Sequence, residues 1–156
     1  MTEPRTFPEG LPLPESDPLT APFWEGCAAR ELRIQRCNGC GVHRHVPTPI
    51  CSGCGSFEYG WDVSRGKGRL FTYTVVHHSV HPATEASVPY NASVIELDDC
   101  GGVFVTSNVI GCANEDLRVG MPLRLVWEPV SPTLWLYRFT PDDANLGSNE
   151  RADALA

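Results

Sequence analysis

The sequences CNGCG at residues 37–41 and CSGCG at residues 51–55 form a matched pair that decides the fold of the N-terminal half of this chain. Each has two cysteines separated by two residues and followed by a glycine, which readily adopts the positive φ angle that a metal-binding turn needs. Two such turns supply four thiolates, the tetrahedral set that zinc accepts in closed structural sites. We therefore predict a structural zinc site formed by Cys37, Cys40, Cys51 and Cys54.

Two other uses of these cysteines are disulfide bonding and the binding of iron. Disulfides are disfavoured because seven cysteines is an odd number and no secretory signal is recognisable. Iron remains open, because four sulfur ligands also suit a rubredoxin-like electron carrier. Cys27, Cys100 and Cys112 lie outside the pattern and are expected to be buried or unreactive. His43 and His45 are expected to be exposed or to lie just outside the metal ligands.

The length and composition fit one domain with a small zinc module attached. The chain has 156 residues, of which 42% are hydrophobic, and no apolar run reaches the roughly 18 residues of a membrane span. Its net charge is −7, with eleven arginines and one lysine. Nucleic acid is a disfavoured partner, because phosphate-backbone binding needs clustered positive charge. These features indicate a cytoplasmic protein that does not enter the membrane.

The N-terminal part of the chain is predicted to be an extended arm followed by one short helix. Residues 1–22 carry six prolines and little periodicity, which is typical of an extended segment. Thr20 is a suitable N-cap ahead of an early helical proline, and apolar residues recur at helical spacing in the segment 21–31. Phe23 and Trp24 in this segment are expected to pack in the core or to dock on a partner.

The remainder of the chain is rich in short strands. Strands are expected on either side of the cysteine turns, at 32–36 and 57–61. Five more segments combine β-branched or aromatic residues and are divided by turn residues: 68–77, 90–97, 103–110, 122–127 and 134–139. Five strands without a long helix between most of them predict a small closed barrel, for which the OB-fold is the strongest candidate.

The predicted architecture is therefore mainly β, with an N-terminal helix, a four-cysteine zinc ribbon and a five-stranded OB-fold barrel. The expected boundaries are a proline-rich arm at 1–19, a helix and rubredoxin-like ribbon at 20–62, the OB-fold at 63–141 and a flexible tail at 142–156.

The order of these parts resembles one known family. The motifs that carry the resemblance, besides the two cysteine pairs, are Thr20-x-x-Phe23-Trp24, Gly66-x-Gly68-x-Leu70-x-x-Tyr73-Thr74-Val75-Val76-His77 and Leu117-x-Val119-Gly120-Met121-Pro122. The chain is similar, over nearly its whole length, to acyl-CoA-associated proteins that join a rubredoxin-like zinc ribbon to an OB-fold. No single motif is decisive, and the ordered combination is what is specific.

The resemblance implies a non-catalytic accessory subunit. Proteins of this family work beside thiolase-superfamily enzymes, such as thiolases, acyltransferases and the aldolases that shorten steroid side chains, and some work beside MaoC-type enoyl-CoA hydratases. We therefore expect a hetero-oligomer in which this chain docks on such an enzyme and helps to form its acyl-CoA site. The partner would then supply the catalytic residues, and this chain would supply none.

A second group of residues is a candidate contact for the phosphates of CoA. Arg65, Lys67 and Arg69 alternate with glycines, so in an extended segment they share one face. The alternative is that they form the solvated entry to a strand. Tyr90 follows a proline and is a candidate for the same ligand surface, with core packing as the alternative.

Histidines cluster where the first barrel strand is expected to end. His77, His78 and His81 are candidates for a metal or an acid–base role, but no carboxylate at fixed spacing orients them. We favour a polar loop at the barrel mouth that faces the partner. The expected docking residues are then Phe23, Trp24, His78 and His81.

Two other functions remain open. A zinc ribbon joined to an OB-fold also occurs in proteins that bind single-stranded nucleic acid, and Phe71, Tyr73 and Phe104 are candidates for base stacking. The net charge argues against this function. A one-iron electron carrier is the other alternative, and a metal assay with a visible spectrum distinguishes it.

Overall fold

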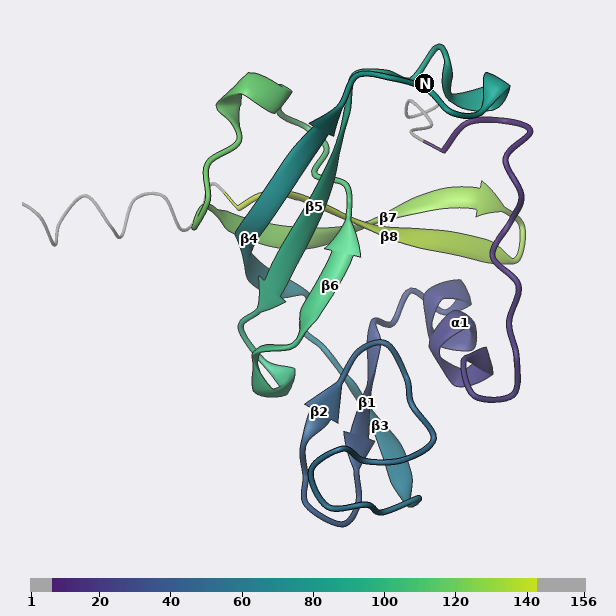
Figure 1. The fold of residues 1–156 in the computed structure, drawn as a ribbon, viewed down its shortest axis with the longest axis vertical. Helices are drawn as coiled ribbons and strands as arrows, with labels where there is room; N and C mark the ends of the chain where they lie inside the picture. The colour runs from purple at the N-terminus through teal and green to yellow at the C-terminus, as the bar shows by residue number, and fades with distance from the viewer. Residues whose placement is uncertain (1–6, 143–156) are drawn as a thin grey trace, which may run out of the picture.

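The computed structural model describes residues 7–142, which form a three-stranded sheet, a five-stranded sheet and one helix beside their junction (Figure 1). The elements in chain order are α1 (Ala21–Ala28), β1 (Arg33–Cys37), β2 (His43–Arg44), β3 (Tyr59–Val63), β4 (Lys67–Val76), η1 (Pro82–Thr84), β5 (Tyr90–Leu97), η2 (Cys100–Gly102), β6 (Phe104–Ser107), η3 (Asn114–Asp116), β7 (Pro122–Ser131) and β8 (Leu134–Pro141). The first six residues of the expected arm, and the expected tail from residue 143, lie outside the described residues. No helix in residues 7–142 is long and apolar enough to cross a membrane.

Helix α1 is shorter than the sequence predicts. It ends at Ala28 because the chain enters a left-handed conformation at Arg30, whose φ is 60°, and the Glu31 N–H bonds back into the helix at 2.8 Å. Thr20 occupies the N-cap position, but its side chain makes no bond to the helix. Its hydroxyl instead accepts a hydrogen bond from the Asp17 N–H at 3.0 Å, so the turn before the helix uses the group that was expected to cap it.

The small sheet builds the ribbon that carries the cysteines. Its strand order is β2-β1-β3, and both pairs are antiparallel. Strand β1 pairs with β3 along its whole length, from Arg33 opposite Val63 to Cys37 opposite Tyr59. The first cysteine turn therefore begins directly at the end of a strand that is paired on both sides, as the alternating residues before it predict.

The large sheet curls into the predicted barrel. Its strand order is β6-β5-β4-β7-β8, and all neighbours are antiparallel. The two edges meet after β6, where Val109 forms a parallel bridge with Phe139 of β8. The Ile110 N–H donates to the Phe139 carbonyl at 2.8 Å, and the Phe139 N–H donates to the Asn108 carbonyl at 3.1 Å. The segment 108–110, expected as part of a strand, thus serves to bring the edges of the OB-fold together.

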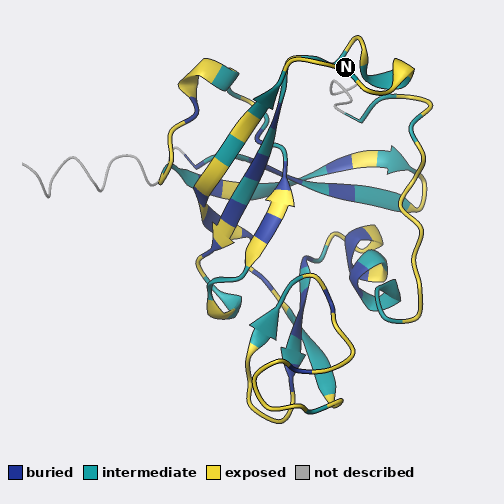
Figure 2. Cartoon of the chain, in the orientation of Figure 1, coloured by how far each residue is buried: buried dark blue, intermediate teal, exposed yellow. Residues whose placement is uncertain are grey.

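One hydrophobic core runs through the helix, the ribbon and the barrel (Figure 2). Phe23 of α1 is buried, and its ring meets the edge of the Tyr137 ring of β8 with a centroid distance of 5.8 Å. Leu32 and Ile34, at the start of the ribbon, are fully buried in the same cluster as Phe139 of the barrel. The ribbon and barrel therefore share apolar contacts, and unfolding one removes support from the other.

Candidate functional site

The four predicted cysteines come together at one end of the ribbon. The Sγ atoms of Cys37 and Cys54 lie 3.6 Å apart, as do those of Cys40 and Cys51. All four sulfur atoms lie within 4.8 Å of one another. A tetrahedral zinc site with Zn–S bonds of about 2.3 Å requires sulfur–sulfur distances of about 3.8 Å. The donor set and its spacing therefore fit a structural zinc ion.

The two cysteine turns are built alike, as their sequences predict. The Gly41 N–H donates to the Cys37 carbonyl at 2.9 Å, and the Gly55 N–H donates to the Cys51 carbonyl at 2.8 Å. Gly41 has a φ of 77° and Gly55 a φ of 74°, a region that other residues enter only with strain. The glycine after each second cysteine thus closes the turn that presents the sulfur atoms.

The surroundings of the four cysteines favour the binding of a cation. The backbone N–H of Cys40 is the main group that lowers the pKa of the Cys37 thiol, to about 6, because it stabilises the thiolate. The Ser56 N–H favours the thiolate of Cys54, but hydrogen bonds with the sulfurs of the other three cysteines, together with burial, outweigh it and raise the pKa of Cys54 to about 12. Four thiolates this close repel one another, and a divalent metal removes that repulsion.

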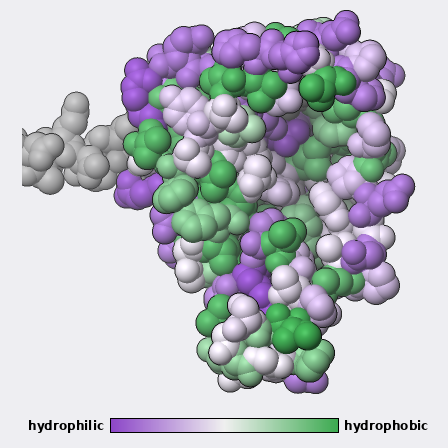
Figure 3. Space-filling model, in the orientation of Figure 1, coloured by the Kyte–Doolittle hydropathy of each residue, from purple (hydrophilic) through white to green (hydrophobic). Residues whose placement is uncertain are grey.

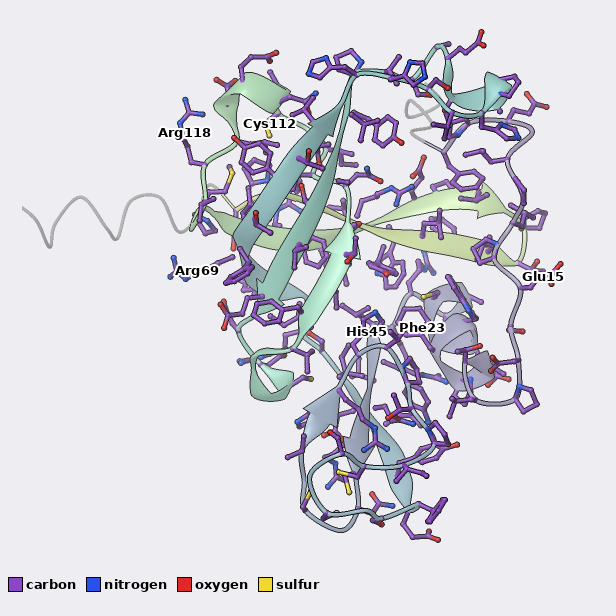
Figure 4. The ribbon with its side chains drawn as sticks, in the orientation of Figure 1. Glu15, Phe23, His45, Arg69, Cys112 and Arg118 are labelled. Carbon is purple, nitrogen blue, oxygen red and sulfur yellow. The ribbon has the colours of Figure 1, made fainter. Side chains whose placement is uncertain are left out.

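The two histidines near the cysteines have different surroundings. His43 Nε2 lies 2.8 Å from Asp62 Oδ2, and Arg36 Nε lies 3.1 Å from the same oxygen, so these residues form a small ionic cluster on the ribbon. His45 was expected to be exposed or close to the metal, but it packs on the core. Its ring lies 5.1 Å from that of Phe23 (Figure 4), and burial lowers the pKa of His45. Neither histidine belongs to the sulfur cluster.

The cations of the expected phosphate-binding segment point to one side of β4 but already have partners. Lys67 Nζ lies 3.1 Å from Asp142, and Arg69 donates to the Gly120 carbonyl at 3.3 Å. Strand β7 places Arg124 directly opposite Lys67, which adds a cation that sequence reasoning missed. Nothing local to Arg124 signals this, because the pairing joins segments more than fifty residues apart. Lys67, Arg69 and Arg124 are called the basic strip below.

The Asp99 carboxylate joins the ribbon to the barrel at the start of this strip. It accepts hydrogen bonds from the Ser64 hydroxyl at 2.7 Å and from the Arg65 N–H at 2.8 Å, and Arg65 Nε lies 3.5 Å away. Partial burial raises the pKa of Asp99, but these hydrogen bonds outweigh burial and hold its pKa below the ordinary value. The carboxylate therefore fixes residues 64–65, which link β3 to β4.

An Asp99→Asn substitution is expected to lower the free energy of unfolding by about 1 kcal/mol at neutral pH, because a charged acceptor is replaced by a neutral one. The folded pKa lies below the unfolded pKa, so the carboxylate stabilises the fold above the unfolded value of about 4. This advantage is lost as the pH falls through the folded pKa. Urea unfolding of both proteins between pH 7 and pH 3 should show the difference shrinking. Asp98→Asn, at an exposed neighbour, is the control, and an equal loss there would contradict the prediction.

The structure does not bring Tyr90 to the basic strip. Tyr90 pairs with Val76 at one end of β4 and β5, whereas Gly68, next to Lys67, pairs with Leu97 at the other end. Val76 is eight positions beyond Gly68 along the strand, which corresponds to about 26 Å. Tyr90 instead lines a cavity at the far end of the barrel. A single phosphate group therefore cannot meet both Tyr90 and the strip.

The expected docking residues lie in two different parts of the structure. Phe23 is part of the core, which was one of its two expected roles, and the half-buried Trp24 packs edge-on against it at 5.1 Å between centroids. His78 and His81 are exposed in the loop before β5. The His81 Nδ1 accepts a hydrogen bond from the Ala83 N–H at 3.1 Å, so this ring also begins the short helix η1.

Two of the three aromatic residues that were candidates for base stacking lie on the outer face of the barrel. Phe71 and Phe104 are exposed, with ring centroids 4.6 Å apart, and Phe71 sits at a bulge where the pairing of β4 with β5 shifts register. Tyr73 does not join them. Its hydroxyl donates to the Leu117 carbonyl at 3.2 Å and its ring packs against the core. The predicted platform of three rings is therefore incomplete.

Known families describe both halves of this architecture. Residues 24–60 match a family model described as the rubredoxin-like zinc ribbon domain of ChsH2, and residues 61–128 match the C-terminal OB-fold domain of ChsH2. The chain belongs to the ChsH2 family. This confirms the resemblance seen in the sequence, and with it the zinc ribbon and the OB-fold.

Three relatives in the ChsH2 family have descriptive names. The chain is 39% identical over 120 residues to a "Probable enoyl-CoA hydratase alpha subunit" of Thermomonospora curvata, covering 76% of this chain and 36% of that one. It is 33% identical over 136 residues to the "3-oxo-4,17-pregnadiene-20-carboxyl-CoA hydratase alpha subunit" of Mycobacterium tuberculosis, covering 87% and 42%. It is 33% identical over 117 residues to a "DUF35 domain-containing scaffold protein" of Methanocaldococcus jannaschii, covering 73% and 80%. The chain thus spans less than half the length of the two hydratase subunits.

A solved structure supports the same family assignment. A chain of the "Ltp2-ChsH2(DUF35) aldolase" superposes on this ChsH2-family chain with a TM-score of 0.75 and 36% sequence identity, covering 83% of this chain and 98% of that one. The ribbon and barrel described above therefore correspond to nearly the whole of a chain that was solved as part of an aldolase.

Proposed function

We propose that this chain is a non-catalytic subunit that docks on a thiolase-superfamily enzyme and helps to form that enzyme's acyl-CoA site. The observation that carries the proposal is the correspondence of the ribbon and barrel with nearly all of one chain of the Ltp2-ChsH2(DUF35) aldolase. The names of the relatives, two hydratase alpha subunits and a scaffold protein, support a place in an enzyme complex. A MaoC-type hydratase is a further candidate partner.

The thiols outside the metal site support a role without covalent catalysis. Burial is the main cause that raises the pKa of Cys27 to about 12 and that of Cys100 to about 11, and burial with nearby Asp116 raises the pKa of Cys112. A thiol must ionise to act as a nucleophile, so these cysteines are poorly suited to attack a thioester. In the proposed complex, the partner supplies the nucleophile and the acid–base residues.

Exposed apolar side chains on the ribbon support docking through this module. Figure 3 shows apolar surface on the ribbon and on the barrel face above it. The exposed ribbon residues are Val42, Val46, Ile50 and Phe57. Together with Trp24, they form the docking surface that we propose, and His78 and His81, in the loop at the opposite end of β4, are proposed as a second, separate contact. Apolar side chains that face water in the isolated chain are stabilised when a partner covers them.

The direct test is to co-express this chain with a thiolase-like or hydratase-like protein encoded beside its gene. We expect the two to co-purify, and we expect the partner's activity on its acyl-CoA substrate to fall when this chain is left out. Val46→Asp should weaken the complex at least about tenfold, because a carboxylate would be desolvated in an apolar interface. Val119→Asp on the barrel is the matched control, since Val46 and Val119 are 67% and 68% exposed. Thioester turnover by this chain alone would overturn the proposal.

The basic strip is the proposed contact for the CoA phosphates. Lys67, Arg69 and Arg124 project from paired strands β4 and β7, with Arg65 just before them. Like charges on directly opposed residues destabilise a sheet, and an anion that binds between them relieves this repulsion. Lys67 and Arg69 are exposed. Their partners are the Asp142 carboxylate and the Gly120 carbonyl, respectively. Phosphate oxygens can replace such partners.

An Arg65→Ala, Lys67→Ala double variant is expected to weaken binding of CoA by the complex roughly tenfold, because two charge-assisted contacts are lost. Isothermal titration calorimetry with CoA measures this effect. Lys67→Arg keeps the charge and should bind CoA nearly as well as the unchanged protein, which separates a phosphate contact from a packing role. Equal affinity of the double variant and the unchanged complex would return these cations to a solvated surface.

A further inference from the structure

A cavity lined by described residues lies at the end of the barrel away from the metal site. Its volume is about 730 Å³, within the range of about 300–1,000 Å³ that is typical of small-molecule sites. The arm contributes Phe7 and Leu11 to its wall, the start of β5 and the residue before it contribute Tyr90 and Pro89, and the segment after β6 contributes Ile110. No part of the proposed acyl-CoA surface, which lies at the other end of β4, belongs to this cavity.

A network of amides holds one wall of the cavity in place. Asn91 is buried, and its side chain donates to the Val109 carbonyl at 2.8 Å and to Asn114 Oδ1 at 3.1 Å. Its own Oδ1 accepts from the Val109 N–H at 2.7 Å and from the Ser93 hydroxyl at 2.8 Å. All the hydrogen-bonding positions of this amide are used, so the wall from Val109 to Asn114 is fixed without a ligand.

An ion pair lies beneath the cavity. Arg138 is 9% exposed and Glu128 is 6% exposed, and Arg138 Nε lies 2.8 Å from Glu128 Oε2. A buried ion pair seldom adds stability over apolar side chains of the same size, so its presence calls for another role. Arg138 lines the cavity, whereas Glu128 does not. Among the described lining residues, the guanidinium is the only charged group, and Glu128 holds it in place from behind.

The arm is attached to the same ion pair. The Phe7 N–H donates to Glu128 Oε1 at 2.7 Å, and Phe7 and Leu11 turn toward the cavity. Leu136 and Val109 supply further apolar surface from the barrel. The site therefore combines apolar walls from two parts of the chain with one fixed cation at the floor.

We propose that this cavity binds a small amphipathic acid, with the carboxylate toward Arg138 and an apolar body between the arm and the barrel. Arg138 lines the cavity, guanidinium groups make charge-assisted hydrogen bonds with carboxylates, and apolar walls favour a hydrocarbon chain or ring. Neutral and cationic amphiphiles of the same length gain no such contact. The site lies at the other end of the barrel from the ribbon docking surface and the basic strip, and next to the loop that carries His78 and His81.

Calorimetric titration of the full zinc-loaded chain with octanoate, 1-octanol and octyltrimethylammonium tests this proposal. Octanoate is expected to bind saturably at one site and at least about tenfold more tightly than the other two probes. Ala113→Phe should abolish binding of octanoate, because Ala113 is an exposed residue of the cavity wall and the added ring fills the space. Val119→Phe places the same ring outside the cavity and should bind octanoate normally.

A second variant tests the charge at the floor. Arg138→Gln with Glu128→Gln removes both charges, so neither is left buried without its partner. This protein should lose the preference for octanoate over 1-octanol while still binding 1-octanol, provided its circular dichroism matches that of the unchanged chain. Failure of this variant to fold leaves the Ala113→Phe comparison decisive. The proposal is overturned if the unchanged chain shows no saturable octanoate binding, or if Ala113→Phe binds octanoate as well as the Val119→Phe control.

Discussion

A Cys37→Ser, Cys51→Ser double variant is expected to lose its zinc and the fold of its ribbon. The substitution removes one sulfur from each cysteine turn, and the ribbon around these turns has only three short strands of its own. Structural zinc contributes an apparent ~10–16 kcal/mol to the folding of small modules, which exceeds the stability of most small domains. Because Leu32 and Ile34 of the ribbon share the core with the barrel, the barrel should also become less stable.

The loss can be followed by zinc content, by the spread of amide signals in NMR spectra and by co-purification with the partner enzyme. Cys112→Ser is the matched control, since Cys112 lies outside the sulfur cluster and is half-buried. It should keep one zinc per chain and assemble normally. Removal of zinc by a chelator should have the same effect as the double variant while an isolated partner enzyme stays folded. A metal-free chain that still binds the partner would contradict the prediction.

A Phe139→Ala substitution is expected to lower the free energy of unfolding by about 3–5 kcal/mol, because it leaves a cavity in a packed core. Phe139 is fully buried and belongs to the cluster that joins the helix, ribbon and barrel. Its backbone also makes both hydrogen bonds that bring the barrel edges together at Asn108 and Ile110. A cavity here removes contacts from the point at which the two edges of the sheet meet.

Phe71→Ala is the matched control for this loss. The same side chain is removed, but Phe71 is half-exposed and contacts Phe104 on the outer face of the barrel. We expect a loss of about 1 kcal/mol, in the range measured for exposed aromatic pairs. Urea unfolding monitored by tryptophan fluorescence measures both variants. Similar losses for the two substitutions would show that Phe139 does not have the central role that its burial indicates.

The parts of the structure that could be predicted are those that depend on neighbours in sequence. Two cysteines separated by two residues must lie on one turn, so two such turns predict a four-sulfur site whatever lies between them. Alternation of β-branched and aromatic residues predicted strands β4, β5, β7 and β8, because the side-chain period of a strand is a local property. The predicted ends of the strands were less accurate than their positions. The segment 108–110 forms a bridge to β8 in place of a longer β6.

The parts that could not be predicted depend on which strands become neighbours. Arg124 joins the basic strip only because β7 pairs with β4, and Tyr90 leaves it because it lies at the other end of β5. His45 was expected to be exposed or near the metal, yet its ring packs on Phe23 of the helix. The cavity beneath the arm likewise requires Phe7 and Glu128, which are 121 residues apart, to meet.

The sequence by itself determined the four-sulfur zinc site, the β-rich architecture and the ChsH2 family, because each is encoded in short spacings and in their order along the chain. Only the tertiary structure decided which cations share a face, which aromatic rings are exposed and where the buried Glu128–Arg138 pair meets a cavity. The physical reason is that local spacing fixes the direction of neighbouring side chains, whereas long-range pairing and burial depend on the free energy of the whole packed chain.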